Sequence, residues 1–183
     1  MVADQRRRIF EGLGTAMAQK GYAATTVADV LEHAKVSRDT FYQQFDSKQT
    51  CFMASFEQHR LRVIEAVLAA PATGTAQHRF AVLLQRYLTA LAAEPDTARL
   101  YLVEVYAAGP VAIQRRNELQ ADFVNALAAI FDARSQEQRF ACQALVAVIA
   151  TMTTNAVVDG GAPALLALHA PIVRLAERLF AAD

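Results

Sequence analysis

The sequence predicts an all-α protein, with an N-terminal three-helix domain of the helix-turn-helix type and a larger helical body, about nine helices in total. Apolar residues make up 54% of the 183 residues, and glycine and proline are few, so long stretches contain no helix breaker. Near the N-terminus, two short segments with an apolar face each follow a helix-capping residue. We expect the first domain over residues 1–50 and the body over residues 51–183.

The first two helices are marked by their ends. A helix is expected over Gln5–Lys20, and Gly21 would end it because glycine tolerates the left-handed backbone of a helix C-terminus. Thr26 then begins a second helix that runs to about Ala34. Asp29, three residues after Thr26, completes a pattern typical of a capping box.

A third helix is expected over Arg38–Phe45, with Ser37 as its cap. The chain then turns, and either Asp46 or Ser47 caps a long fourth helix that reaches about Ala70. Because the boundary between the two domains falls within the fourth helix, we expect this helix to join them as a rigid rod.

Proline and glycine divide the body into four further helices and a final segment. The final segment begins at Pro163, and it is either kinked or split at Pro171. The four helices are expected over Thr75–Ala93, Asp96–Ala108, Pro110–Ala133 and Ser135–Asp159.

The second and third helices have the pattern of a helix-turn-helix, in which the second helix of the pair enters the major groove of DNA. Val36 is the apolar residue of the turn, and Phe41 and Phe45 lie four residues apart, so both point into the core. Residues 1–50 carry seven Lys or Arg and six Asp or Glu, a net charge of +1. DNA binding would therefore depend on the placement of charges and not on a basic field.

Two runs of this region, residues 21–30 and 36–48, resemble the signature of the TetR family of transcriptional regulators, over about a quarter of the chain. The resemblance implies a double-stranded DNA operator, with base contacts from Arg38, Asp39, Thr40 and Gln43 and phosphate contacts from Thr26, Ser37, Tyr42 and Lys48. The matching runs are Gly21-Tyr22-Ala23-Ala24-Thr25-Thr26-Val27-Ala28-Asp29-Val30 and Val36-Ser37-Arg38-Asp39-Thr40-Phe41-Tyr42-Gln43-Gln44-Phe45-Asp46-Ser47-Lys48.

One position departs from the family pattern. Lys35 stands in the turn where the family usually has glycine. Glycine permits a positive φ there, whereas lysine adopts it at a cost of about 1 kcal/mol. In compensation, Lys35 is expected to add a phosphate contact.

The resemblance extends more loosely to the body, over Leu100–Pro110 and the following Arg115 and Arg116. It implies a homodimer in which the last two long helices form a four-helix bundle with those of a second subunit. Such a bundle would account for the apolar run Phe140–Val158. A membrane span is the alternative, but five polar side chains within the run favour burial in protein.

The resemblance further implies a pocket in the body for a small, largely apolar effector. For most of the candidate aromatic residues, a place in the core is the alternative. Glu104, flanked by two valines, is expected either to contact the ligand or to pair with Arg115 or Arg116. The candidates are Phe80, Tyr87, Tyr101, Glu104, Tyr106, Phe123, Met152 and Asn155.

The sequence gives no support to other chemistry. Cys51 and Cys142 are far apart and the four histidines are scattered, so neither a metal site nor a cofactor is expected. A catalytic nucleophile with its base and a glycine-rich phosphate loop are also missing, so we do not expect an enzyme. The N-terminus has no secretory signal, which favours the cytoplasm. The expected function is a ligand-responsive repressor, and the alternative is a helical interaction module with reduced or lost DNA binding.

Overall fold

The computed structural model describes residues 2–68 and 73–181, and all regular structure in these ranges is helical, as the sequence predicts. Ten α-helices and one short 3₁₀ helix, η1, are present in them. Their bounds are α1 (Val2–Ala24), α2 (Val27–Ala34), α3 (Arg38–Tyr42), α4 (Lys48–Leu68), α5 (Ala76–Ala93), α6 (Pro95–Leu102), η1 (Glu104–Tyr106), α7 (Pro110–Ile130), α8 (Gln136–Asp159), α9 (Gly161–Ala167) and α10 (His169–Leu179).

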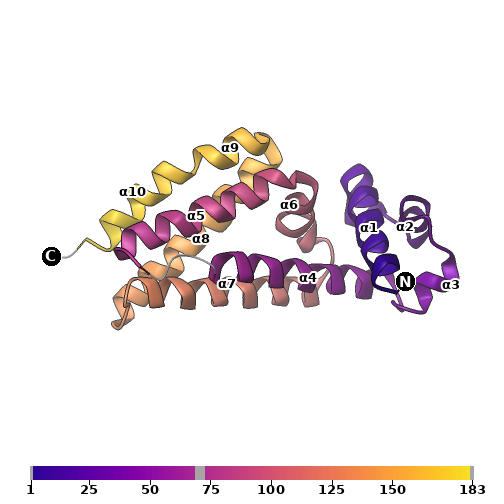
Figure 1. Cartoon of the computed structure of the whole chain (residues 1–183), viewed down its shortest axis with the longest axis horizontal. Coiled ribbons are helices and arrows are strands. Elements are labelled where there is room, and N and C mark those ends of the chain that lie inside the picture. The colour runs from indigo at the N-terminus through magenta and orange to yellow at the C-terminus, as the bar shows by residue number, and fades with distance from the viewer. Residues whose placement is uncertain (1, 69–72, 182–183) are drawn as a thin grey trace.

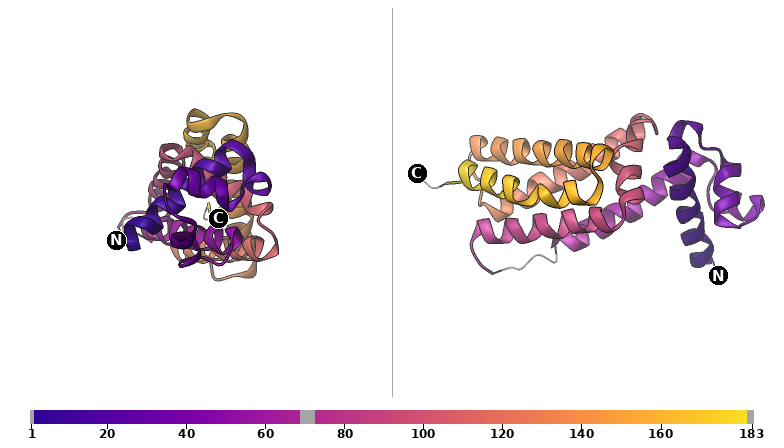
Figure 2. Two further views of the ribbon diagram at one scale, coloured as in Figure 1. Left: turned by 90° about the vertical axis from the view of Figure 1, so that its right-hand side faces the viewer. Right: turned by 90° about the horizontal axis from the view of Figure 1, so that it is seen from above.

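The molecule is elongated (Figure 1). Helices α1–α3 form one end, which we call the reading end, and α5–α10 form the body. α4 runs from the reading end along the body (Figure 1). Seen from above, α1 stands across the long axis, whereas the long body helices follow it (Figure 2).

α1 is longer than expected at its N-terminal end. It begins at Val2 and not at Gln5, and Asp4 pairs with Arg7 in its first turn at 2.6 Å between Oδ1 and Nη2. The predicted break at Gly21 is present, because φ of 74° and ψ of 165° are not helical there. One short turn follows before the chain reaches α2.

The predicted caps of α2 and α3 are confirmed. The Asp29 N–H donates to Thr26 Oγ1 at 3.3 Å, and the Thr26 N–H donates to Asp29 Oδ2 at 2.8 Å. Ser37 Oγ accepts from the Thr40 N–H at 3.1 Å at the start of α3. Lys35 ends α2 in the left-handed conformation, with φ of 53° and ψ of 44°, as its replacement of glycine predicts.

The third helix is shorter than expected. α3 ends at Tyr42, because the N–H groups of Gln44 and Phe45 both donate to Phe41 O at 2.9 Å and tighten the backbone into a turn.

Ser47, and not Asp46, caps α4. The Thr50 N–H donates to Ser47 Oγ at 3.1 Å, and the Ser47 N–H donates to Thr50 Oγ1 at 3.0 Å. The expected end of this helix near Ala70 lies outside the described residues.

Two expectations for the body are corrected. The single helix expected over Asp96–Ala108 is wrong, because α6 ends at Leu102 and η1 follows, which brings the Glu104 carboxylate to the Tyr22 N–H. The last segment is split before Pro171 and not at it. Pro171 therefore lies in the first turn of α10, where its missing N–H removes no helical hydrogen bond.

One hydrophobic cluster, which we call the shared cluster, runs from the reading end into the body. It includes Phe41 and Phe45 of the recognition segment, Phe52 and Phe56 of α4, and Tyr101 of α6. A second buried cluster is formed in the body by α5, α7, α8 and α10. The reading end thus has no separate core of its own but packs on α4, α6 and η1.

α8 is long and apolar enough to cross a membrane, but one such helix is weak evidence for a membrane span, because core helices pass the same test. Only 28% of its most apolar window is buried within the chain. Phe140, Met152 and Val158 of α8 are exposed, so one side of this helix carries apolar surface that the chain itself does not cover.

We predict that Lys35→Gly stabilises the protein by about 0.5–1 kcal/mol. Glycine removes the strain of the left-handed backbone, and this gain exceeds the extra conformational entropy that glycine loses on folding. Equilibrium unfolding in urea measures the change. Glu32→Gly is the matched control, since Glu32 is exposed inside α2, where glycine costs about 1 kcal/mol. A loss of stability in both variants would contradict the strain assigned to Lys35.

Candidate DNA-binding face and effector cavity

The recognition segment, residues 37–45, presents a polar face because its aromatic residues are divided between two sides. Phe41 and Phe45 are buried in the shared cluster, whereas Tyr42 is 46% exposed. Arg38, Asp39 and Gln43 are also exposed, and within the described residues their side chains make no hydrogen bond or ion pair. This face therefore offers a guanidinium, a carboxylate, an amide and a phenol to a partner.

Several hydroxyl groups assigned to DNA are already engaged in caps. Ser37 Oγ and Thr40 Oγ1 lie 2.8 Å apart, in addition to the backbone cap. Thr26 Oγ1 donates to Asp29 Oδ2 at 2.8 Å. Lys20 pairs with Asp29, and this ion pair together with the Thr26 bonds holds the pKa of the carboxyl far below its ordinary value.

Lys48 has an internal role that the sequence analysis missed. Its ammonium donates to Tyr22 O at 2.6 Å and to Thr25 O at 2.7 Å, and it lies 4.1 Å from the centre of the Tyr22 ring. Burial lowers the pKa of this ammonium. Lys48 thus ties the start of α4 to the turn between α1 and α2. Lys35 is exposed, and its carbonyl accepts from the Arg8 guanidinium.

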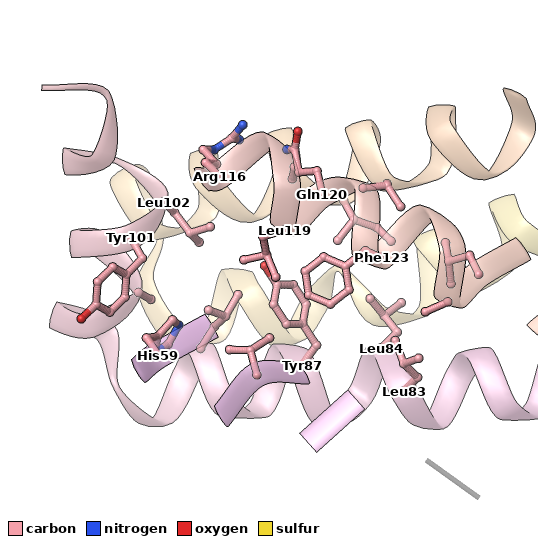
Figure 3. Close-up of a pocket in the computed structure, with 18 of the residues that line it drawn as sticks. His59, Leu83, Leu84, Tyr87, Tyr101, Leu102, Arg116, Leu119, Gln120 and Phe123 are labelled. Carbon is pink, nitrogen blue, oxygen red and sulfur yellow. The ribbon is translucent and has the colours of Figure 1, made fainter. Parts of the chain in front are cut away.

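A cavity opens in the body between α4, α5, α6, α7 and α8 (Figure 3). Most of its wall is aliphatic or aromatic. Phe56, His59 and Val63 of α4 line one side of it and lie, with Phe52 of the shared cluster, on one face of that helix. The other apolar walls are formed by Phe80, Leu83, Leu84, Leu91, Ala98, Leu102, Leu119, Phe123, Ala126, Leu127, Val146, Ile149 and Ala150.

Four of the eight predicted ligand-binding residues line this cavity, namely Phe80, Tyr87, Tyr101 and Phe123. The sequence analysis missed three polar wall residues, His59, Arg116 and Gln120. A signal was present, because Gln120 and Arg116 lie three and seven residues before Phe123 on the same face of α7, and His59 follows the apolar spacing of α4.

The other four predicted residues lie elsewhere. Glu104 faces the reading end, where its Oε2 accepts from the Tyr22 N–H at 2.7 Å and its Oε1 lies 4.0 Å from Arg99 Nε. It therefore pairs neither with Arg115 nor with Arg116.

Tyr106 is 51% exposed, and the Arg116 guanidinium lies 5.0 Å from the centre of its ring. Met152 is 41% exposed and Asn155 is also exposed, so both lie on the part of α8 that the chain itself does not cover.

The polar groups of the cavity are mostly uncharged. His59 stacks on Tyr101 with ring centres 4.3 Å apart, and burial lowers the pKa of its imidazole to about 4. Tyr101 Oη shares a hydrogen bond of 2.6 Å with Ser55 Oγ, and burial raises the pKa of its phenol to about 12. At neutral pH, Arg116 is therefore the one formally charged side chain in the described wall.

Neither cysteine is placed for reactivity. Cys51 and Cys142 are both buried and unpaired, and burial raises the pKa of both thiols, that of Cys51 to about 12. Among the described residues, no group of three or more His, Cys, Asp or Glu is arranged to hold a metal ion.

Comparison with known proteins agrees with this geometry. Residues 15–54 match the family model of bacterial regulatory proteins, tetR family. Among curated proteins, none matches this sequence.

Solved structures of similar fold include the fatty acid degradation regulator FadR from Bacillus halodurans, with a TM-score of 0.81 and 19% identity over 97% of this chain and 98% of that one. FadR from Bacillus subtilis in complex with stearoyl-CoA has a TM-score of 0.77 and 20% identity, over 96% of this chain and 97% of that one. A regulatory protein of the tetR family from Rhodococcus RHA1 has a TM-score of 0.78 and 20% identity, over 98% of each chain. Residues 15–54 thus match the tetR-family helix-turn-helix, and the chain has the fold of these regulators over almost its full length.

Proposed function

We propose that this protein is a ligand-responsive repressor, which binds a palindromic operator as a dimer and leaves it when a largely apolar effector fills the cavity of the body. The observation that carries the proposal is that the cavity and the recognition segment use the same packed residues. Phe56 and Tyr101 line the cavity and also belong to the shared cluster, which contains Phe41 and Phe45. A shift of the cavity wall would therefore be transmitted to the recognition segment by direct packing.

A hydrogen bond reinforces this path. Glu104 lies in η1, between the cavity-lining helices α6 and α7, and its carboxylate accepts from the backbone of Tyr22. Lys48 holds the carbonyl groups of the same turn. An effector that prefers one position of α6 would thus select one orientation of the reading end, which is a shift between existing populations. In a dimer, the recognition segments must lie about 34–36 Å apart to enter successive major grooves.

The division into a DNA-binding domain over residues 1–50 and a body over residues 51–183 is part of this proposal. α4 crosses the boundary near its start, and the shared cluster packs on both sides of it. The solved FadR from Bacillus subtilis holds stearoyl-CoA. That complex supports, for this chain, an effector with a long apolar part.

For the dimer, we propose an interface formed by α8 and the last helix, α10. The exposed side of α8 includes Phe140, Ala147, Thr151, Asn155 and Val158, which follow one another at helical spacing. On α10, Leu179 is 40% exposed. A second copy that covers these residues would bury the apolar surface that one chain leaves open.

The alternative function is a helical interaction module with reduced or lost DNA binding. The engagement of Lys48 and of the Thr26, Ser37 and Thr40 hydroxyl groups within the chain favours it. A mobility-shift titration against the DNA upstream of the gene, at two salt concentrations, separates the two. Saturable binding that weakens steeply with salt supports the repressor, whereas absence of binding at low salt supports the interaction module.

We predict that Arg38→Ala changes the sequence preference, because an exposed and unengaged guanidinium at the start of the recognition segment is suited to a base edge. The expected loss is about 1–3 kcal/mol on operator DNA and less on random DNA. Tyr42→Phe, the matched variant, should weaken binding to both DNAs by a similar factor, since the lost hydroxyl group would contact a phosphate. Equal losses on both DNAs for Arg38→Ala would refute its role in base recognition.

We predict that Ala147→Arg converts the dimer into monomers. Ala147 is exposed at the middle of the α8 stripe, so the two-fold symmetry of the proposed interface brings two like charges together and leaves them without water. Light scattering coupled to gel filtration gives the mass in solution. Thr89→Arg on the exposed side of α5 should leave the mass unchanged. A wild-type monomer, or a dimer that survives Ala147→Arg, contradicts the interface.

A further inference from the structure

The cavity is long, and its two ends differ in chemistry. α5 lines it from Phe80 to Leu91 and α7 lines it from Arg116 to Leu127, which corresponds to about 16 Å along each helix. The end beside α6 carries His59, Tyr101 and Arg116, whereas Leu83 and Leu84 lie toward the other end (Figure 3). A ligand that matches this wall has a linear apolar part and one polar end, with the polar end toward the reading end.

The charge of the wall selects the chemistry of that polar end. Arg116 lies at one edge of the cavity beside Gln120 (Figure 3), and within the described residues it has no carboxylate partner, unlike Arg115, which pairs with Glu118 at 2.7 Å. A guanidinium without a carboxylate at the edge of an apolar cavity favours a small anion.

The surroundings disfavour a head group with many charges. A polar groove between α1, α4 and α6 shares His59 and Tyr101 with the cavity, so a bulky head that passed these residues would enter it. The groove contains three acids and two arginines, and one of these arginines, Arg7, already pairs with Asp4 and Glu11. The acids are Glu11, Glu94 and Asp96, and the other arginine is Arg62. A head with several phosphates would meet like charges there.

We propose that the effector is a linear amphiphile with a single anionic head, a long-chain carboxylate, whose head binds Arg116 and whose chain points toward Phe80. This inference rests on the proposed function, because it names the effector of the same cavity. It differs from a transfer of the stearoyl-CoA ligand, since it assigns a carboxylate and excludes a coenzyme thioester as the preferred form.

The test is calorimetric titration of the full-length protein, without DNA, with dodecanoate, dodecan-1-ol and dodecanoyl-CoA, each below the concentration at which it aggregates. Dodecanoate should bind at least tenfold more tightly than the alcohol, because the charged hydrogen bonds to Arg116 are lost with the carboxylate. It should also bind more tightly than the thioester. Equal affinity for acid and alcohol, or tighter binding of dodecanoyl-CoA, overturns the proposal.

Variants of neighbouring arginines locate the head group. Arg116→Gln should remove the preference for acid over alcohol while the alcohol still binds, and Arg116→Lys should keep part of the preference. Arg115→Gln is the matched control, because Arg115 is exposed on the same helix and is absent from the cavity wall, and it should change nothing. A preference that survives in Arg116→Gln places the head elsewhere and overturns the assignment.

The result of this titration and the test of the proposed function can be told apart. Loss of operator binding in the mobility-shift titration would refute the repressor while leaving the affinities for the three ligands intact. Conversely, a protein that binds its operator but shows no preference for dodecanoate would refute only the head-group assignment.

Discussion

The packing of Tyr101 against α4 is the constraint on which the rest of the structure depends. Its ring lies 5.4 Å from that of Phe56 and 6.1 Å from that of Phe52, and its hydroxyl group bonds Ser55. Tyr101 belongs both to the cavity wall and to the shared cluster, which extends to the recognition segment. Because close-packed interiors transmit displacements, the cavity wall cannot move independently of α4.

The turn between α1 and α2 is held to the same unit by two charged groups. The Glu104 carboxylate accepts a hydrogen bond from the Tyr22 N–H, and the Lys48 ammonium donates to the carbonyl groups of Tyr22 and Thr25. Gly21 makes this possible, since its positive φ directs the chain away from α1 and a side chain there would lie 3.3 Å from Glu104 Oε2. The Glu104 carboxylate of η1 and the Lys48 ammonium of α4 thus bind the backbone of the same short segment. Hydrogen bonds to charged groups contribute more than neutral ones, so this junction is firm although it contains few residues.

The parts of the fold that local chemistry determines were predictable from the sequence. The caps at Thr26 and Ser37 and the left-handed Lys35 follow from short-range backbone and side-chain preferences. The break after Leu102 was not, because the bond from Glu104 to Tyr22 joins residues 82 positions apart, and helix propensity alone continues the helix. The hydrogen bonds of Lys48 within the chain were missed for the same reason, since its partners are carbonyl groups of a distant turn.

The candidate site divides in the same way. Phe80, Tyr87, Tyr101 and Phe123 were found because aromatic residues in body helices tend to face inward. Met152 and Asn155 were assigned to the cavity because a helix that is apolar all round does not reveal which side meets its own body. Arg116 was considered only as one of two possible partners for Glu104, and the position of η1 shows that these two side chains face different regions.

The central claim is that the reading end and the cavity wall form one unit, which is packed through the shared cluster and held together by the Glu104 junction. The most direct measurement is amide hydrogen exchange of Glu104→Ala, with Glu118→Ala on exposed α7 as the control. The account predicts that exchange at Tyr22 and in the recognition segment becomes faster by about tenfold or more, while α8 keeps its protection, because one charge-assisted hydrogen bond is lost. Unchanged protection of the recognition segment in Glu104→Ala would contradict the claim.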